Sequence, residues 1–207
     1  MFKRLGVFAV AAFLVCLMAV PAAAQNMSAG IVGGVSLANL GGDVGDFTNT
    51  KAKLGFAGGA FFALDLHEYF RLQFQGQYVQ KGAEFSDVEE KTKVDYIELL
   101  VPLTLTIPIQ DSPIAPRLFA GPAVSFLMNC KFTNGFSEDC KDITTSTDFG
   151  VFFGGGADFM VGNGAIMLDI LYNLGLTNIN DDVDADEFSV KNQNWQFMAG
   201  YRFFLGG

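Results

Sequence analysis

The segment at residues 148–179 constrains the fold most, because it reads as two long alternating strands around a tight turn. At residues 149–161, every second position from Phe149 onward is apolar or small. Residues 166–173 alternate in the same way after a Gly-Asn-Gly turn, which is the pattern of a β-hairpin. In each of the two strands an aspartate, Asp158 in the first and Asp169 in the second, lies on the face opposite to the apolar one. Long strands with one apolar face and carboxylates on the other are typical of strands that cross a bilayer.

The N-terminus predicts a secretory signal peptide at residues 1–24. Two basic residues precede an apolar run, and Ala22 and Ala24 form an A-x-A cleavage site before Gln25. The alternative is an uncleaved membrane anchor, but the run falls short of the roughly 20 residues that a spanning helix needs. We therefore expect residues 25–207 to form the mature protein, as one domain.

The composition is acidic and apolar at once. The chain has a net charge of -9 and 50% hydrophobic residues, with a mean hydropathy of +0.31. Loss of the signal peptide would remove Lys3 and Arg4 and leave 11 basic residues against 22 acidic ones. This excess of acid argues against nucleic-acid partners, which bind basic patches. Beyond the signal peptide, the sequence has no run that is apolar enough for a spanning helix, so the apolar surface favours a closed barrel.

Alternation of apolar and polar residues predicts about eight strands in all. Six further strands are expected at residues 28–40, 54–65, 71–85, 96–109, 116–128 and 190–207. Their connectors alternate between short turns and long loops, as in barrels with short periplasmic turns and long outer loops. We expect an all-β fold, an eight-stranded antiparallel up-and-down transmembrane β-barrel in the outer membrane of a Gram-negative-type bacterium.

Aromatic residues gather toward both ends of the predicted strands, as the girdles of such barrels do. The outer girdle is expected to contain Tyr78, Tyr172 and Trp195, and the inner one Phe159, Tyr201 and Phe203.

Charged residues on the inward faces predict a network in the lumen. Six lie near the periplasmic strand ends, and Glu98 belongs to a second polar layer with Gln75 and Gln77; the six are Asp65, Arg71, Arg117, Asp158, Asp169 and Arg202. An eight-stranded barrel has room only for its own side chains, and buried charges must be paired. We therefore expect a structural plug, and the alternative is an ion-conducting or gating network.

Two cysteines remain in the mature chain, Cys130 and Cys140, both within a polar segment. In an exported protein this arrangement predicts a disulfide that closes a surface loop. The segment lacks the further thiol or imidazole ligands that a metal site would require.

At this point the sequence resembles the small outer-membrane β-barrel proteins grouped as PorT-like, within the wider OmpA/OmpX-type set. The resemblance covers most of the mature chain and rests on FQGQYVQKGAEF, YIELLVPLTLTI, PRLFAGPAV, DFGVFFGGGADF, ILYNLGLTNI and KNQNWQFMAGYRF. It implies insertion by the outer-membrane assembly machinery. Such barrels commonly end on an aromatic residue, whereas this chain adds Leu205, Gly206 and Gly207 after Phe204.

Three motifs suggest chemistry, and each has a simpler interpretation. His67, the one histidine, falls in a predicted periplasmic turn, far from any nucleophile that a hydrolase would place at the outer leaflet. The glycines at residues 154–156 lie within a strand and precede no helix, so they do not form a phosphate loop. Asp182, Asp184 and Asp186 start like a calcium loop, but Glu187 and Gln193 occupy the positions of its glycine and its glutamate. We expect a solvated acidic loop there, with loose divalent binding as the alternative.

The sequence therefore favours a monomeric, non-enzymatic barrel without cofactors, whose acidic outer loops give it a structural or surface-interaction role. Outer-membrane lipid and lipopolysaccharide are its expected surroundings, and the sequence identifies no external ligand. Two alternatives are a narrow channel for small solutes or ions, and a soluble lipocalin-like carrier in the periplasm.

Overall fold

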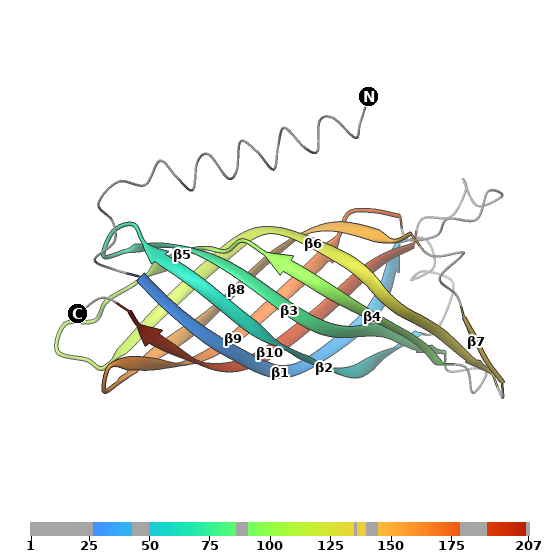
Figure 1. Cartoon of the computed structure of the whole chain (residues 1–207), viewed down its shortest axis with the longest axis horizontal. Helices are drawn as coiled ribbons and strands as arrows, with labels where there is room; N and C mark the ends of the chain where they lie inside the picture. Colours follow the sequence, from blue (N-terminus) through green and yellow to red (C-terminus); the bar gives the residue numbers. More distant parts are fainter. Residues whose placement is uncertain are drawn as a thin grey trace, which may run out of the picture.

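The protein forms one antiparallel β-sheet that closes on itself (Figure 1). The computed structural model describes residues 27–42, 50–85, 91–134, 136–139, 145–178 and 190–205. Its strands are β1 (Met27–Gly42), β2 (Thr50–Asp65), β3 (Phe70–Phe85), β4 (Lys91–Leu100), β5 (Leu103–Thr106), β6 (Ile114–Asn134), β7 (Phe136–Asp139), β8 (Thr147–Val161), β9 (Gly164–Gly175) and β10 (Val190–Phe204). Among these residues, no helix is long and apolar enough to cross a membrane.

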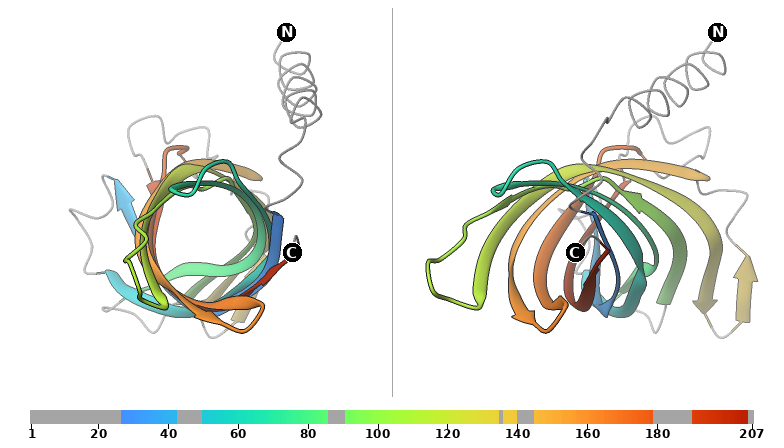
Figure 2. Two further views of the ribbon diagram at one scale, coloured as in Figure 1. Left: turned by 90° about the vertical axis from the view of Figure 1, so that its left-hand side faces the viewer. Right: turned by 60° about the vertical axis from the view of Figure 1, so that its left-hand side comes forward.

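The sheet closes because the first and last strands pair along their whole length. β1 and β10 run antiparallel in one register from Ser28 opposite Phe204 to Gly42 opposite Val190. Viewed along its axis, the molecule is a closed ring of strands (Figure 2). This confirms the predicted eight-stranded antiparallel barrel, since β4 and β5 share one position in the wall and β7 pairs with β6 off the ring.

A proline divides the predicted strand at residues 96–109 into β4 and β5. Pro102 has no N–H to donate, so the ladder lapses there, although its carbonyl accepts a bond from the Gln73 N–H at 3.0 Å. The register does not change across the break, because Leu100 pairs with Ala123 and Leu103 with Ala120. The two segments are therefore one barrel strand with a local interruption.

The register fixes the tilt of the strands. A path through directly paired residues leaves β8 at Asp158 and returns to it at Asp148, ten residues along the strand. Eight strands with a stagger of ten residues tilt by roughly 40°. Paired residues share a face of the sheet, so the whole path lies on the inner face: Asp158, Met167, Gly200, Val32, Gly59, Gln77, Glu98, Ser125 and Asp148.

The apolar face of the wall points outward. Phe149, Phe153, Leu103 and Leu118 are each more than half exposed, whereas the residues between them along the strands are mostly buried in the lumen. Within the barrel wall, no second layer of strands covers these apolar side chains in the described part of the chain. An exposed apolar band on a closed barrel is the surface that hydrocarbon solvates.

Short turns join the strands at one end of the barrel, at residues 66–69, 107–113 and 162–163. In the last of these turns Gly162 has a φ of 59°, as the first central position of a type II′ turn requires. The predicted signal peptide and the predicted acidic loop with Asp182, Asp184 and Asp186 lie outside the described residues.

The predicted cysteine loop starts later than expected. β6 continues to Asn134, past the predicted end of this strand at residue 128, and pairs with β7 beyond it. Cys130 is therefore a strand residue, opposite Val94 of β4 and buried. Cys140 lies outside the described residues, so the disulfide remains a prediction.

Replacing Leu103 with arginine tests the outward face. Its side chain is 52% exposed on the wall, and a cation on the lipid face near mid-depth costs about 2–4 kcal/mol. We expect Leu103→Arg to lower the unfolding free energy in lipid vesicles by that amount, measured from urea titrations and heat-modifiable gel migration. Leu103→Phe is the matched control and should fold normally; equal stability of both variants would contradict the assignment.

Candidate functional site

The inner end of the lumen holds a layer of paired charges, which we call the inner charged layer. It consists of Asp65, Arg71, Arg117, Asp158, Asp169 and Arg202. The structure thus brings together all six residues that the sequence places near the periplasmic ends. Three arginines and three aspartates balance in charge, as buried ions require.

Asp158 is the centre of the inner charged layer. Its carboxylate is fully buried and lies 3.2 Å from Arg71 Nη1, 3.0 Å from Arg117 Nε and 2.8 Å from Arg202 Nη2. The contact with Arg117 is an ion pair without hydrogen-bond alignment, since neither atom has a hydrogen-bond partner within the described chain. The three arginines belong to β3, β6 and β10, so this one carboxylate links strands around the ring.

The other two aspartates, Asp169 and Asp65, accept hydrogen bonds from Arg117 and Arg71. Arg117 Nη2 donates to both carboxylate oxygens of Asp169, at 2.7 and 2.8 Å. Arg71 Nε donates to Asp65, whose side chain is 27% exposed at the mouth of the barrel. The Phe204 ring lies 4.8 Å from the Arg202 guanidinium carbon and shields it. This layer therefore leaves only one of its six side chains substantially open to solvent.

A second cluster, the outer polar layer, lies farther along the lumen around Glu98. Glu98 is fully buried and pairs with Lys81 at 2.7 Å. Its two oxygens also accept hydrogen bonds from Gln77, Ser125, Asn173 and, at 3.4 Å, Gln196. The charge is thus neutralised once and its lone pairs are satisfied, the condition under which a buried ion pair is tolerated.

Lys81 is the charged residue of this layer that the sequence did not reveal; Ser125, Asn173 and Gln196 are its further polar members. Lys81 continues the inward alternation of β3 four residues beyond Gln77, with Val79 between them. The predicted strand at residues 71–85 already includes Lys81, but the apolar Val79 interrupts the polar inner face between Gln77 and Lys81.

A polar network lies at the outer end of the lumen. The Asn192 Nδ2 group donates to Asp148 at 2.9 Å and to the Tyr96 hydroxyl at 3.3 Å, which joins β10, β8 and β4. A register shift between Asp95 and Tyr96 turns both residues into the interior.

The predicted girdle residues belong to β3, β8, β9 and β10. Trp195 packs on Tyr172 at 4.9 Å between ring centroids, and Tyr201 packs on Phe203 at 4.6 Å near the C-terminal end of β10. Tyr78 lies opposite Gly58 and Ile97, and Phe159 opposite Ile166. Their role at the membrane interfaces remains a prediction.

His67 is exposed in the short turn between β2 and β3, where its ring stacks on Tyr69 at 5.4 Å. A hydrogen bond to Glu68 and the charge of that carboxylate raise the pKa of the Tyr69 hydroxyl above its ordinary value. Among the described residues, no cluster of three or more histidine, cysteine or acidic side chains is arranged to hold a metal ion.

Comparison with known proteins identifies the family. Residues 8–203 match the outer membrane protein beta-barrel domain. The chain belongs to this family. Its predicted location in the outer membrane is thereby confirmed. A search of curated proteins gave no match to the chain.

Two of the solved structures that share this fold align over most of both chains. One is neisserial surface protein A, with 15% identity, a TM-score of 0.54, and 84% of this chain aligned to 96% of that one. The other is OprG from Pseudomonas aeruginosa, with 11% identity, a TM-score of 0.53, and 88% of this chain aligned to 98% of that one. At such low identity these likenesses concern the fold alone, and a fold does not decide an activity.

Replacing Asp158 with asparagine tests the inner charged layer. The change keeps the shape of the side chain but leaves three arginines around a neutral amide, and breaking a buried ion pair costs about 3–5 kcal/mol. We expect a loss of this size in urea unfolding followed through Trp195, the single tryptophan. Asp65→Asn, at the partly exposed rim, should cost clearly less; equal losses would mean that Asp158 is not the centre of the layer.

Proposed function

We propose that this family member is a non-enzymatic, non-conducting barrel that acts at the cell surface through its outer loops. On this proposal the lumen is structural: its charged layers fasten the strands and no solute passes. The membrane-spanning part then serves as a rigid base for the segments between the strands at the outer end.

The observation that carries the proposal is the filled interior. Between the inner charged layer and the outer polar layer, the described residues enclose a cavity of about 20 Å³, which has room for about one water molecule. Lys81, Glu98, Arg117 and Asp158 are all less than a tenth exposed. A lumen packed in this way supports a structural role in preference to transport.

A narrow channel is the second candidate, and one feature favours it. Gln73, Gln75 and Gln77 follow one another along the inner face of β3, each amide bonding the next at 2.8 Å. This strip is polar from the charged layer to Glu98. The water-sized cavity beside it supports the closed state.

The inference that the protein is not an enzyme rests on the same interior and on His67. That histidine accepts a weak backbone hydrogen bond from Tyr69, at 3.5 Å, in an exposed turn at the end opposite the outer loops. A soluble lipocalin-like carrier does not fit the family or the exposed apolar band.

We further infer that the barrel is a monomer of the PorT-like group, surrounded by outer-membrane lipid and lipopolysaccharide and inserted by the assembly machinery. The full pairing of β1 with β10 supports the monomer, because the ring closes within one chain. The PorT-like assignment rests on the six stretches quoted above.

Planar-bilayer recording tests the closed lumen. We expect the purified, heat-modifiable protein to leave the bilayer conductance at its background level at membrane potentials of either sign. Steady conductance steps that disappear on changing Arg71 or Arg117 would favour the channel instead.

Epitope insertion tests the surface role. A tag after Asp184 should be labelled by antibody on intact cells, because the long loops face outward. The matched insertion after Ser112, in the turn between β5 and β6, should be labelled only in permeabilised cells. The reverse pattern would place the acidic loops in the periplasm and exclude a surface role for them.

A further inference from the structure

The interior of the barrel changes from charged to apolar to polar along several strands in parallel. On β9 the inward side chains run Asp169, Leu171, Asn173. On β10 they run from Arg202 through Met198 to Gln196. The apolar members lie at one level, which we call the apolar collar: Val32, Leu100, Phe119, Phe152, Leu171 and Met198.

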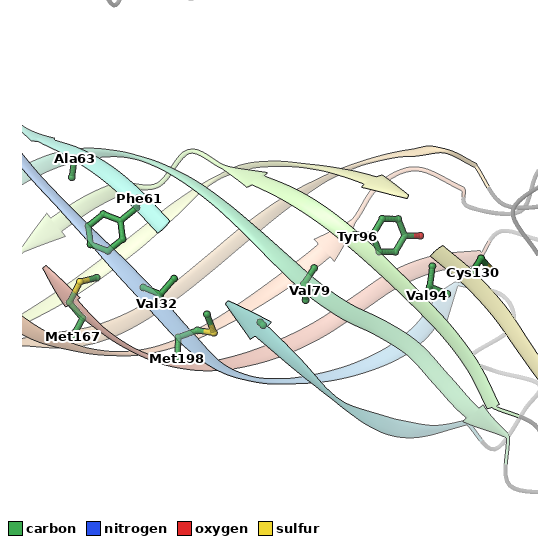
Figure 3. Close-up of a cluster of buried hydrophobic side chains, with 10 residues drawn as sticks. Val32, Phe61, Ala63, Val79, Val94, Tyr96, Cys130, Met167 and Met198 are labelled. Atoms are coloured by element: carbon green, nitrogen blue, oxygen red, sulfur yellow. The ribbon is translucent and has the colours of Figure 1, made fainter. Parts of the chain in front are cut away.

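The collar is buried and consists of two packed groups, Val32 with Met198 in one, and Leu100, Phe119, Phe152 and Leu171 in the other. All six side chains are less than a tenth exposed, and all six line the same water-sized cavity. The Phe119 and Phe152 rings lie 6.5 Å apart. Figure 3 shows Val32 and Met198 projecting into the interior between Met167 toward one end and Tyr96 toward the other.

Small residues in the wall make this packing possible. A Cβ atom at Gly154 would lie 2.6 Å from the Phe119 ring, and one at Gly121 would lie 3.2 Å from the Phe152 ring. The glycines at residues 154–156 do not form a phosphate loop. In the structure, the absence of a side chain at Gly154 leaves the space that the Phe119 ring occupies.

We propose that the apolar collar, and not the ion pairs on either side of it, is the barrier to ions and water in this lumen. The proposal deepens the proposed function, on which it rests, by locating the seal. Charged and amide side chains hydrate readily once they separate, so a polar layer that loosens lets water enter. An apolar constriction stays dry under the same fluctuation, because water gains no hydrogen bonds there.

The polar strip of Gln73, Gln75 and Gln77 on β3 is the part of the lumen wall where the apolar collar is interrupted. Gln73 and Gln75 of β3 line the cavity together with Thr104 of β5 and with Arg117 and Asp169 of the inner charged layer. The Gln73 and Gln75 amides bond to each other and on to Gln77, which occupies groups that would otherwise attract water. The barrier therefore depends on the rings that line the same cavity, Phe119 above all, whose ring centroid lies 5.9 Å from the guanidinium carbon of Arg117.

Matched double variants test the assignment in planar bilayers. Phe119→Ser with Phe152→Ser removes two collar rings and adds hydroxyls that hydrate the gap. Arg117→Ala with Asp169→Ala removes one ion pair of the inner layer, and Lys81→Ala with Glu98→Ala removes that of the outer layer, both without a change in net charge. Heat-modifiable migration of each purified protein selects the preparations that fold.

We expect discrete conductance steps from the collar variant and none from the unmodified protein or from either ion-pair variant. Steps from the ion-pair variants with a silent collar variant would overturn the inference while leaving the proposed function intact. Conductance of the unmodified protein would instead overturn the proposed function itself. If the double collar variant does not fold, Phe152→Ser alone gives the same comparison, and its silence beside conducting ion-pair variants counts against the collar.

Discussion

Backbone hydrogen bonding in lipid is the constraint on which the rest of this structure depends. Hydrocarbon offers no partner to an N–H or C=O group, so a sheet that crosses a bilayer must close on itself. The pairing of β1 with β10 along their full length meets this requirement. Pro102 shows how tightly the ladder is kept: it cannot donate, yet the register continues unchanged on either side. The outward apolar face follows from the same solvent.

Closure with eight strands then determines what the interior can contain. A ring this narrow holds only its own side chains, so each inward polar group needs a partner that is also inside. Asp158 finds three arginines and Glu98 finds one lysine with several amide and hydroxyl donors. The apolar collar separates these two layers. The lumen is therefore arranged in layers along the barrel axis, and the positive and negative charges balance separately within the inner charged layer and within the outer polar layer.

The sequence predicts the strands, their facing and the inner charged residues well, because a period of two assigns every side chain to a face once one face is known. It could not predict the partners. Which arginine meets Asp158 depends on the stagger of ten residues around the ring, and alternation within a single strand carries no information about stagger. Lys81 was missed because Val79 interrupts the polar face of its strand. The collar was missed because its residues come from six different strands, whose relative positions depend on the same stagger. The cysteine segment was assigned to a loop because polar residues near Cys130 mask the continuation of β6.

The most direct test of the account uses Trp195, the single tryptophan, which is 47% exposed on the outer wall and packs on Tyr172. Its fluorescence is to be measured in vesicles whose acyl chains carry bromine, with acrylamide in the water as the comparison. If the apolar faces meet hydrocarbon, bromine near the headgroup end of the chain quenches Trp195 and acrylamide does so weakly. Strong quenching by acrylamide with no effect of the brominated lipids would contradict the orientation of every strand.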